Sequence, residues 1–140
     1  MAKFQISEPV RVERKDTPVM FMRANSDTPK AIQQAWAQFE AAVALKGRKF
    51  FGAYDVSTRE YRVCAQLKEN DNPHGLGFEV ATLPGGAYLC ARLHGEPPAV
   101  YEQIPAVFSE LVKRGAPDAA RPSTEFYRSR DVIDLLLPIA

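Results

Sequence analysis

This sequence lacks the features that mark several large classes of protein. Its two cysteines, Cys64 and Cys90, lie in unrelated segments without the spacing of a zinc site or a disulfide framework. The amino terminus has no apolar signal-peptide core, and no stretch approaches the roughly 18 apolar residues of a membrane span. We therefore expect a soluble, cytoplasmic protein with free thiols and no association with a membrane.

An excess of charge of one sign is also missing. The 140 residues include 18 basic and 17 acidic side chains, which gives a formal net charge of +1. Nucleic-acid-binding domains usually carry a clear basic excess, so direct binding to nucleic acid is not predicted. The sequence has no G-x-S-x-G, Walker-type or H-E-x-x-H motif, and it predicts neither a cofactor nor a metal.

The main positive feature is an internal repeat. A shift of 68 residues, the separation of Val19 from Ala87, places one apolar strand-like segment on another. The same shift aligns further positions: Trp36 with Ile104, Phe39 with Val107, Val43 with Leu111, and Gly47 with Gly115. This pattern predicts two similar halves, about residues 10–68 and 77–140, within a single domain of residues 1–140.

Each half is expected to run strand, helix, strand, strand. Before the first helix, Ser26, Asp27 and Thr28 are candidates for the capping residue, and Pro29 is a proline suited to a helix start. Pro105 lies inside the second helical pattern and should kink that helix or move its start later. The expected strands of the first half are residues 10–24, interrupted at Pro18, and residues 50–55 and 60–68, which should form a hairpin. Those of the second half are residues 77–93, 123–128 and 132–139.

These elements predict an α+β fold. Neither half could bury a sheet face alone, so the two βαββ repeats should share one mainly antiparallel sheet. Both helices are then expected on one face of this sheet. The other face would be free to form a ligand cleft.

Strand alternation sorts the candidate ligand-binding side chains. We assign the apolar Leu89 and Phe126 to the helix-covered face. The residues next to them in each strand are then expected on the free face: Tyr88, Cys90, Glu125 and Tyr127. The repeat and the alternation place others nearby: Met20, Met22 and Tyr54. Trp36 lies on the apolar stripe of the first helix, where it could pack in the core or close one end of the cleft.

A carboxylate among tyrosines and methionines suits a flat, lipophilic and often cationic ligand. The aromatic faces supply contact area and attract cations, the carboxylate supplies a counter-charge, and methionine adapts its shape. An alternative is that Glu125 is a solvated strand residue and that the tyrosines are ordinary sheet residues.

An ordered set of short segments resembles the GyrI-like small-molecule-binding domain, which is also the effector-binding half of AraC- and MerR-type multidrug regulators. The segments are Gly52–Asp55, Glu60–Cys64, Leu83–Tyr88, Leu93–Gly95, Arg121–Tyr127 and Leu136–Ile139. The resemblance implies a ligand cleft along the interface of two βαββ units. It also implies that the glutamate of an E-x-Y motif, here Glu125 with Tyr127, reaches into that cleft. Where the family often has Arg-Tyr-Asp, this chain has Glu60-Tyr61-Arg62.

Three functions follow from these observations and the resemblance. The first is a stand-alone binding module that senses or sequesters a lipophilic or aromatic, often cationic, small molecule and acts with a regulatory protein partner. The second is a hydrolase of reactive electrophiles, with Glu125 as general base and Tyr127 or Tyr54 orienting the substrate. The third is a protein-interaction module like the family members that inhibit DNA gyrase.

Overall fold

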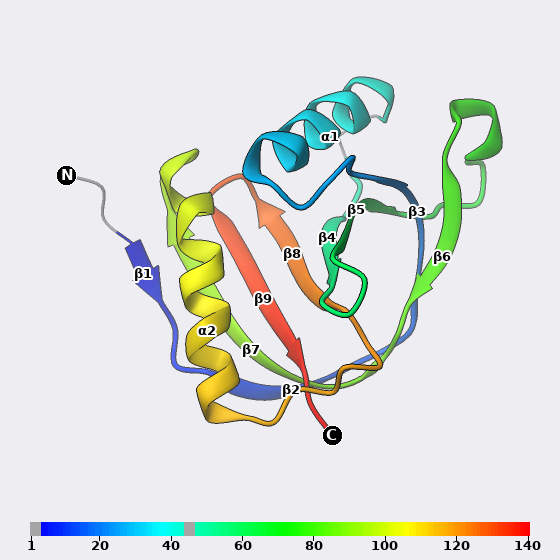
Figure 1. The fold of residues 1–140 in the computed structure, drawn as a ribbon. Coiled ribbons are helices and arrows are strands. Elements are labelled where there is room, and N and C mark those ends of the chain that lie inside the picture. The colour runs from blue at the N-terminus through cyan, green and yellow to red at the C-terminus, as the bar shows by residue number, and fades with distance from the viewer. Residues whose placement is uncertain (1–3, 44–46) are drawn as a thin grey trace.

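The structure is a computed structural model that describes residues 4–43 and 47–140. Within these residues, nine strands form one antiparallel sheet and two α-helices pack on it (Figure 1). The helices are α1 (Pro29–Ala42) and α2 (Ile104–Arg114). The strands are β1 (Phe4–Ile6), β2 (Val10–Arg14), β3 (Thr17–Arg23), β4 (Phe50–Asp55), β5 (Glu60–Gln66), β6 (Glu79–Leu83), β7 (Gly86–Gly95), β8 (Ser123–Ser129) and β9 (Val132–Pro138).

Each half contains the expected βαββ unit preceded by one additional strand. The first half runs β2-β3-α1-β4-β5 and the second runs β6-β7-α2-β8-β9, with β4 and β8 paired at the centre of the sheet. The expected strand segments 10–24 and 77–93 each contain two strands that are divided by a tight turn. The first turn lies at Lys15-Asp16 and not at Pro18, which pairs with Thr82 inside the sheet.

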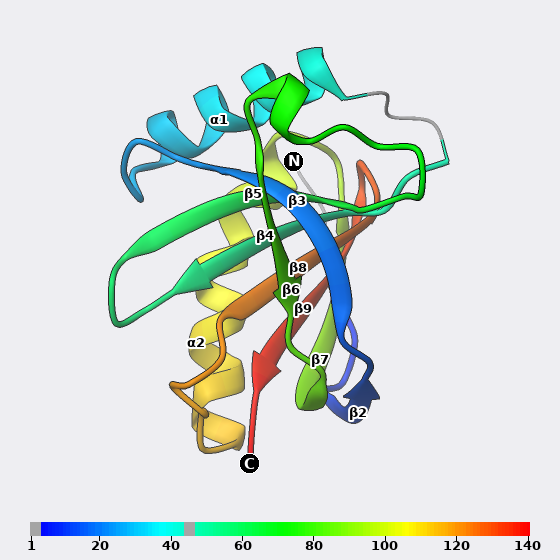
Figure 2. The same ribbon diagram turned by 90° about the vertical axis from the view of Figure 1, so that its right-hand side faces the viewer.

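The additional strands are exchanged between the halves. Strand β2 pairs with β7, and β6 pairs with β3. The two turns cross closely, and the backbone N–H of Gly85 donates to Asp16 Oδ1 at 2.7 Å. A Cβ on Gly85 would lie 2.5 Å from the carbonyl oxygen of Arg14, so this crossing requires glycine. The exchange brings the turn between β2 and β3 beside the turn between β6 and β7 at the lower edge seen in Figure 2.

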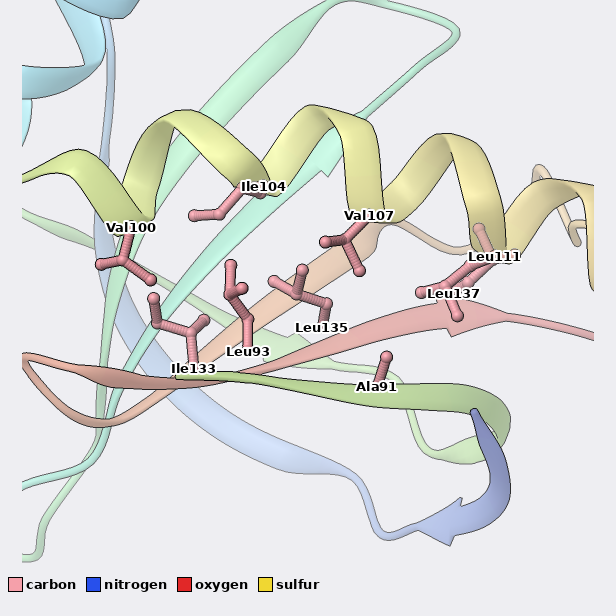
Figure 3. Packing of buried hydrophobic residues seen from close by; sticks show 9 residues of the cluster. All are labelled: Ala91, Leu93, Val100, Ile104, Val107, Leu111, Ile133, Leu135 and Leu137. Carbon is pink, nitrogen blue, oxygen red and sulfur yellow. The ribbon is translucent and has the colours of Figure 1, made fainter. Parts of the chain in front are cut away.

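Both helices cover the same face of the sheet, as expected. Cross-strand partners in a sheet point to the same side, and the pairs Val63–Gly52, Gly52–Glu125 and Glu125–Leu135 run from β5 to β9. Val63 packs in the cluster under α1, and Leu135 packs in the cluster under α2 (Figure 3). We call this side of the sheet the helix face and the opposite side the helix-free face.

The two helices begin where the sequence predicted. Thr28 caps α1, with its side-chain oxygen accepting from the backbone N–H of Ala31 at 3.3 Å, and Pro29 is the first helical residue. Pro105 is near the start of α2, which follows a 3₁₀ turn at Ala99–Gln103, so the expected later start is confirmed. Neither helix in the described part of the chain is long and apolar enough to cross a membrane.

The helix-free face has an apolar cluster of its own. The rings of Phe51 and Phe126 stack with their centroids 5.0 Å apart, and Cys64 and Tyr88 are buried in the same cluster. Both faces of the central strands therefore carry buried apolar side chains, and different residues form the cluster on each face.

Candidate functional site

Glu125 lies in the middle of the helix face. It is on β8, between Gly52 of β4 and Leu135 of β9. Helix α1 packs on β3 and β5 to one side of these strands, and α2 packs on β7 and β9 to the other. The expectation that Glu125 and Tyr127 face away from the helices is therefore wrong, since both lie on the side of the sheet that carries α1 and α2.

Two tyrosines hold one oxygen of this carboxylate. Tyr61 from β5 donates to Glu125 Oε1 at 2.7 Å, and Tyr127 from β8 donates to the same oxygen at 2.6 Å. The indole N–H of Trp36 on α1 donates to the Tyr61 hydroxyl at 3.1 Å. This chain of hydrogen bonds fixes the direction of the carboxylate from three different elements.

Gly52 of β4 leaves the room that the hydrogen bond between Tyr61 and Glu125 requires. A Cβ at this position would overlap the Tyr61 hydroxyl and lie 2.5 Å from Glu125 Oε1. Glycine therefore leaves the space that the carboxylate and the phenol share. The packing indicates that the cluster is built into the strands and does not depend on mobile surface side chains.

The surroundings of Glu125 shift the pKa values of the carboxyl group and of both tyrosines. Burial raises the pKa of Glu125 above its ordinary value, and the hydrogen bonds from Tyr127 and Tyr61 oppose that rise. Burial and the neighbouring carboxylate raise the pKa values of Tyr61 and Tyr127 well above 10.0. Both tyrosines therefore stay protonated and serve as hydrogen-bond donors near neutral pH.

The second carboxylate oxygen is open. Glu125 is only partly buried, and within the described residues its Oε2 accepts no hydrogen bond from the protein. No fully buried side-chain nitrogen or oxygen in this part of the chain lacks a partner, so Oε2 reaches solvent. A ligand can thus meet a fixed carboxylate oxygen without displacing either tyrosine.

An aromatic frame surrounds the carboxylate. The Tyr127 ring is in edge contact with Trp36 at 5.1 Å between centroids, and with Tyr101 at 6.1 Å. Trp36 belongs to α1, and Tyr101 belongs to the 3₁₀ turn that leads into α2, so these rings connect both helices across β8. All three rings are partly exposed, so they offer apolar area on the same face of the sheet as the carboxylate.

Three other predicted site residues lie on the helix face and pack in the same apolar cluster as Tyr61, but none has a hydrogen bond to Glu125. The Tyr54 hydroxyl donates to Asp27 Oδ2 at 2.9 Å, and Met22 packs against the cluster under α1. Met20 is 1% exposed in that cluster, so it supports the strands from below in this conformation.

Tyr88 and Cys90 lie on the helix-free face, so the expectation that they share a face with Glu125 is wrong. Tyr88 packs there and donates to the carbonyl oxygen of Pro84. The error comes from Phe126, which was assigned to the helix face but packs beside Tyr88 on the helix-free face.

The shift of 68 residues caused a separate error, the grouping of Met20 and Met22 with Tyr88, because the equivalent strands start at Thr17 and Gly86, which are 69 residues apart. A slip of one residue moves every side chain of a strand to the other face.

Two residues of the site were not among the predicted ones. Tyr61 alternates with Arg62 in β5, and its parity matches Val63 of the core, which is the signal that could have found it. Tyr101 precedes Ile104 by three residues, the spacing of neighbours on one helical face. Leu89 packs under α2 as expected, whereas Phe126 faces the helix-free side.

The polar neighbours of Glu125 favour an organic ligand over a metal ion. They are phenol and indole groups, whereas metal sites use histidine, cysteine and carboxylate ligands. Across residues 4–43 and 47–140, no three such side chains come together as a candidate metal site.

Comparisons with known proteins agree with a binding domain. A family model described as "GyrI-like small molecule binding domain" matches residues 7–140. No curated protein sequence matches the chain.

Several solved structures share the fold. An integron cassette protein from Vibrio cholerae has a TM-score of 0.74 at 18% identity, over 98% of this chain and 99% of that one. SAV2435, solved bound to tetraphenylphosphonium, has a TM-score of 0.69 at 14% identity, over 96% and 94%. The EcmrR C-terminal domain has a TM-score of 0.63 at 11% identity, over 98% of both chains. At such identities the likeness shows the fold alone, and roles must be argued from the site.

The space at Gly52 gives a first test of the site. We expect Gly52→Ala to lower the free energy of unfolding by about 1–3 kcal/mol, because the new methyl group overlaps the Tyr61 hydroxyl. Tyr61→Phe removes that hydroxyl, so the double variant should cost less than the sum of the two single variants in urea unfolding. Strict additivity would show that the glycine and the tyrosine do not share this space.

Proposed function

Because the chain belongs to the GyrI-like family of small-molecule-binding domains, we propose that it binds lipophilic cations on the helix face, between α1 and α2. The observation that carries this proposal is the Glu125 carboxylate, whose Oε1 is held by two tyrosines while Oε2 remains open. In this role Glu125 is the counter-charge of the ligand. Trp36, Tyr101 and Tyr127 supply its apolar contact surface.

A cation is favoured by the balance of charges at the site. Burial disfavours the ionised form of Glu125, and no cationic side chain among the described residues pairs with it. A positively charged ligand would stabilise the carboxylate where lysine or arginine does not. The aromatic faces add cation–π attraction and area for a ligand with apolar substituents.

The structural neighbour SAV2435 supports this class of ligand, since it was solved with the lipophilic cation tetraphenylphosphonium. For the present chain this cation is a suitable probe. Trp36 is the single tryptophan of the sequence and lies at the site, so its fluorescence reports binding there.

We expect tetraphenylphosphonium to quench Trp36 fluorescence saturably. Glu125→Gln should raise the dissociation constant about tenfold or more, because it removes the counter-charge while keeping the shape of the side chain. The measurement is a fluorescence titration of both proteins at one ionic strength. Glu110→Gln is the matched control, since Glu110 is exposed on α2 and its loss changes the net charge equally. Equal weakening by both variants would contradict a specific role for Glu125.

The affinity for the same cation should also depend on pH. Burial raises the pKa of Glu125 above 4.5, so the free carboxyl is protonated at a pH where an exposed glutamate is already charged. Affinity should rise with pH through the raised pKa, by about the same total factor that Glu125→Gln loses, and should level off above it. The Glu125→Gln variant should give a flat profile over the same range. A rising profile in this variant would assign the titration to another group.

Hydrolysis of a reactive electrophile is the second candidate function. The raised pKa of Glu125 makes its carboxylate a stronger base, and the open Oε2 is accessible to a water molecule. Wild type incubated with styrene oxide should then form the diol at a rate that Glu125→Gln loses by about 100-fold. Equal rates of diol formation in both proteins and in buffer would contradict hydrolysis and would leave ligand binding as the proposed function.

A further inference from the structure

A cavity lies on the helix-free face, on the opposite side of the sheet from Glu125. Its volume is about 140 Å³, and it is bounded by β3, β4, β5 and β6 and by Pro84 and Pro122. The exchange of β6 onto β3 contributes to it, because Ala81, Thr82 and Leu83 at the end of β6 line the cavity together with residues of β3.

The floor of this cavity is apolar. Val19, Phe21, Ala53 and Cys64 line it, and each of them is at most 3% exposed. Burial raises the pKa of the Cys64 thiol to about 12, so this side chain is neutral and acts as a small hydrophobic group. Ala81 of β6, the cross-strand partner of Val19, also lines the cavity.

The charged side chains that line the cavity are Asp55, Glu60 and Arg62, and they form its rim. Glu60 accepts from the Nε atoms of Arg23 and Arg62, each at 2.7 Å, and Arg23 also pairs with Glu79. The Arg62 guanidinium lies over the Phe21 ring at 4.4 Å. The two guanidinium groups are therefore engaged with two carboxylates and an aromatic face.

Asp55 is the remaining carboxylate of the rim. Its Oδ1 accepts from the backbone N–H and the hydroxyl of Ser57, and these bonds lower its pKa, so it is ionised at neutral pH. Within the described residues Asp55 has no cationic partner. The cavity lining thus holds two carboxylates, Asp55 and Glu60, against the single guanidinium group of Arg62.

We propose that this cavity is a second binding site, which takes a small primary amine carried on a single aromatic ring. An apolar cavity of roughly 150 Å³ in another protein holds one benzene molecule, so the volume here fits one ring. The ring lies on the apolar floor, and the ammonium group faces Asp55 at the rim. The site differs from the helix-face site in both its position and the size of its ligand.

Benzylamine is the probe for this proposal. In ¹H–¹⁵N spectra of the labelled protein, we expect saturable shifts at amides of β3, β5 and β6 and no quenching of Trp36 fluorescence. Ala81→Leu fills the cavity and should weaken binding at least tenfold. Asp55→Asn keeps the acceptor of the turn, removes the charge, and should weaken binding about tenfold.

Two controls separate this cavity from the helix face. Val80→Leu adds bulk to the other side of β6, where Val80 is 50% exposed, and should leave the affinity unchanged. Glu125→Gln should also leave it unchanged. The proposal is overturned if benzylamine gives no saturable shifts or if its binding survives Ala81→Leu. It is also overturned if benzylamine quenches Trp36 fluorescence and Glu125→Gln abolishes both the quenching and the binding. Binding of benzoate as tight as that of benzylamine would overturn it as well.

Discussion

The hydrogen bonds from Tyr61 and Tyr127 to one oxygen of Glu125 allow a carboxylate to occupy an apolar sheet face. A buried charge without such donors would neutralise by taking up a proton or would disrupt the packing around it. The donors come from two strands, and the indole of Trp36 connects them to α1. Gly52 between those strands leaves the necessary space. The geometry of the helix face therefore depends on a carboxylate that is oriented but only half satisfied.

The same strands serve two different surfaces because their side chains alternate. In β4, Gly52 makes room for the carboxylate on one face, and its neighbour Ala53 lines the cavity on the other. In β5, Tyr61 and Cys64 are divided in the same way. The faces are not electrically independent, since the Glu125 carboxylate adds to the effect of burial in raising the pKa of the Cys64 thiol. A thin sheet with apolar packing on both sides transmits such an effect, because little solvent screens it.

The sequence predicts the local elements well, but it predicts poorly how the strands pair and which face of the sheet each side chain is on. A cap just before Pro29, the late start of α2 at Pro105 and the β4–β5 hairpin all depend on neighbouring residues, and all were predicted correctly. The face on which a strand directs a given side chain is fixed within that strand alone, so Glu125 and Tyr88 could not be compared without the pairing register. The exchange of β2 and β6 is a long-range arrangement, and only the glycine at 85 hints at the close crossing that accompanies it.

The half-satisfied carboxylate also explains why a binding site and a stable fold coexist on the helix face. If both oxygens were bonded to the protein, Glu125 would be a structural group with nothing to offer a ligand. If neither were bonded, it would lack a fixed direction, and ordering it on binding would cost affinity. Two donors on Oε1 settle its direction before a ligand arrives, and the open Oε2 keeps the interaction available. Because burial already raises the pKa of this group, an arriving cation gains more from it than from a solvated carboxylate.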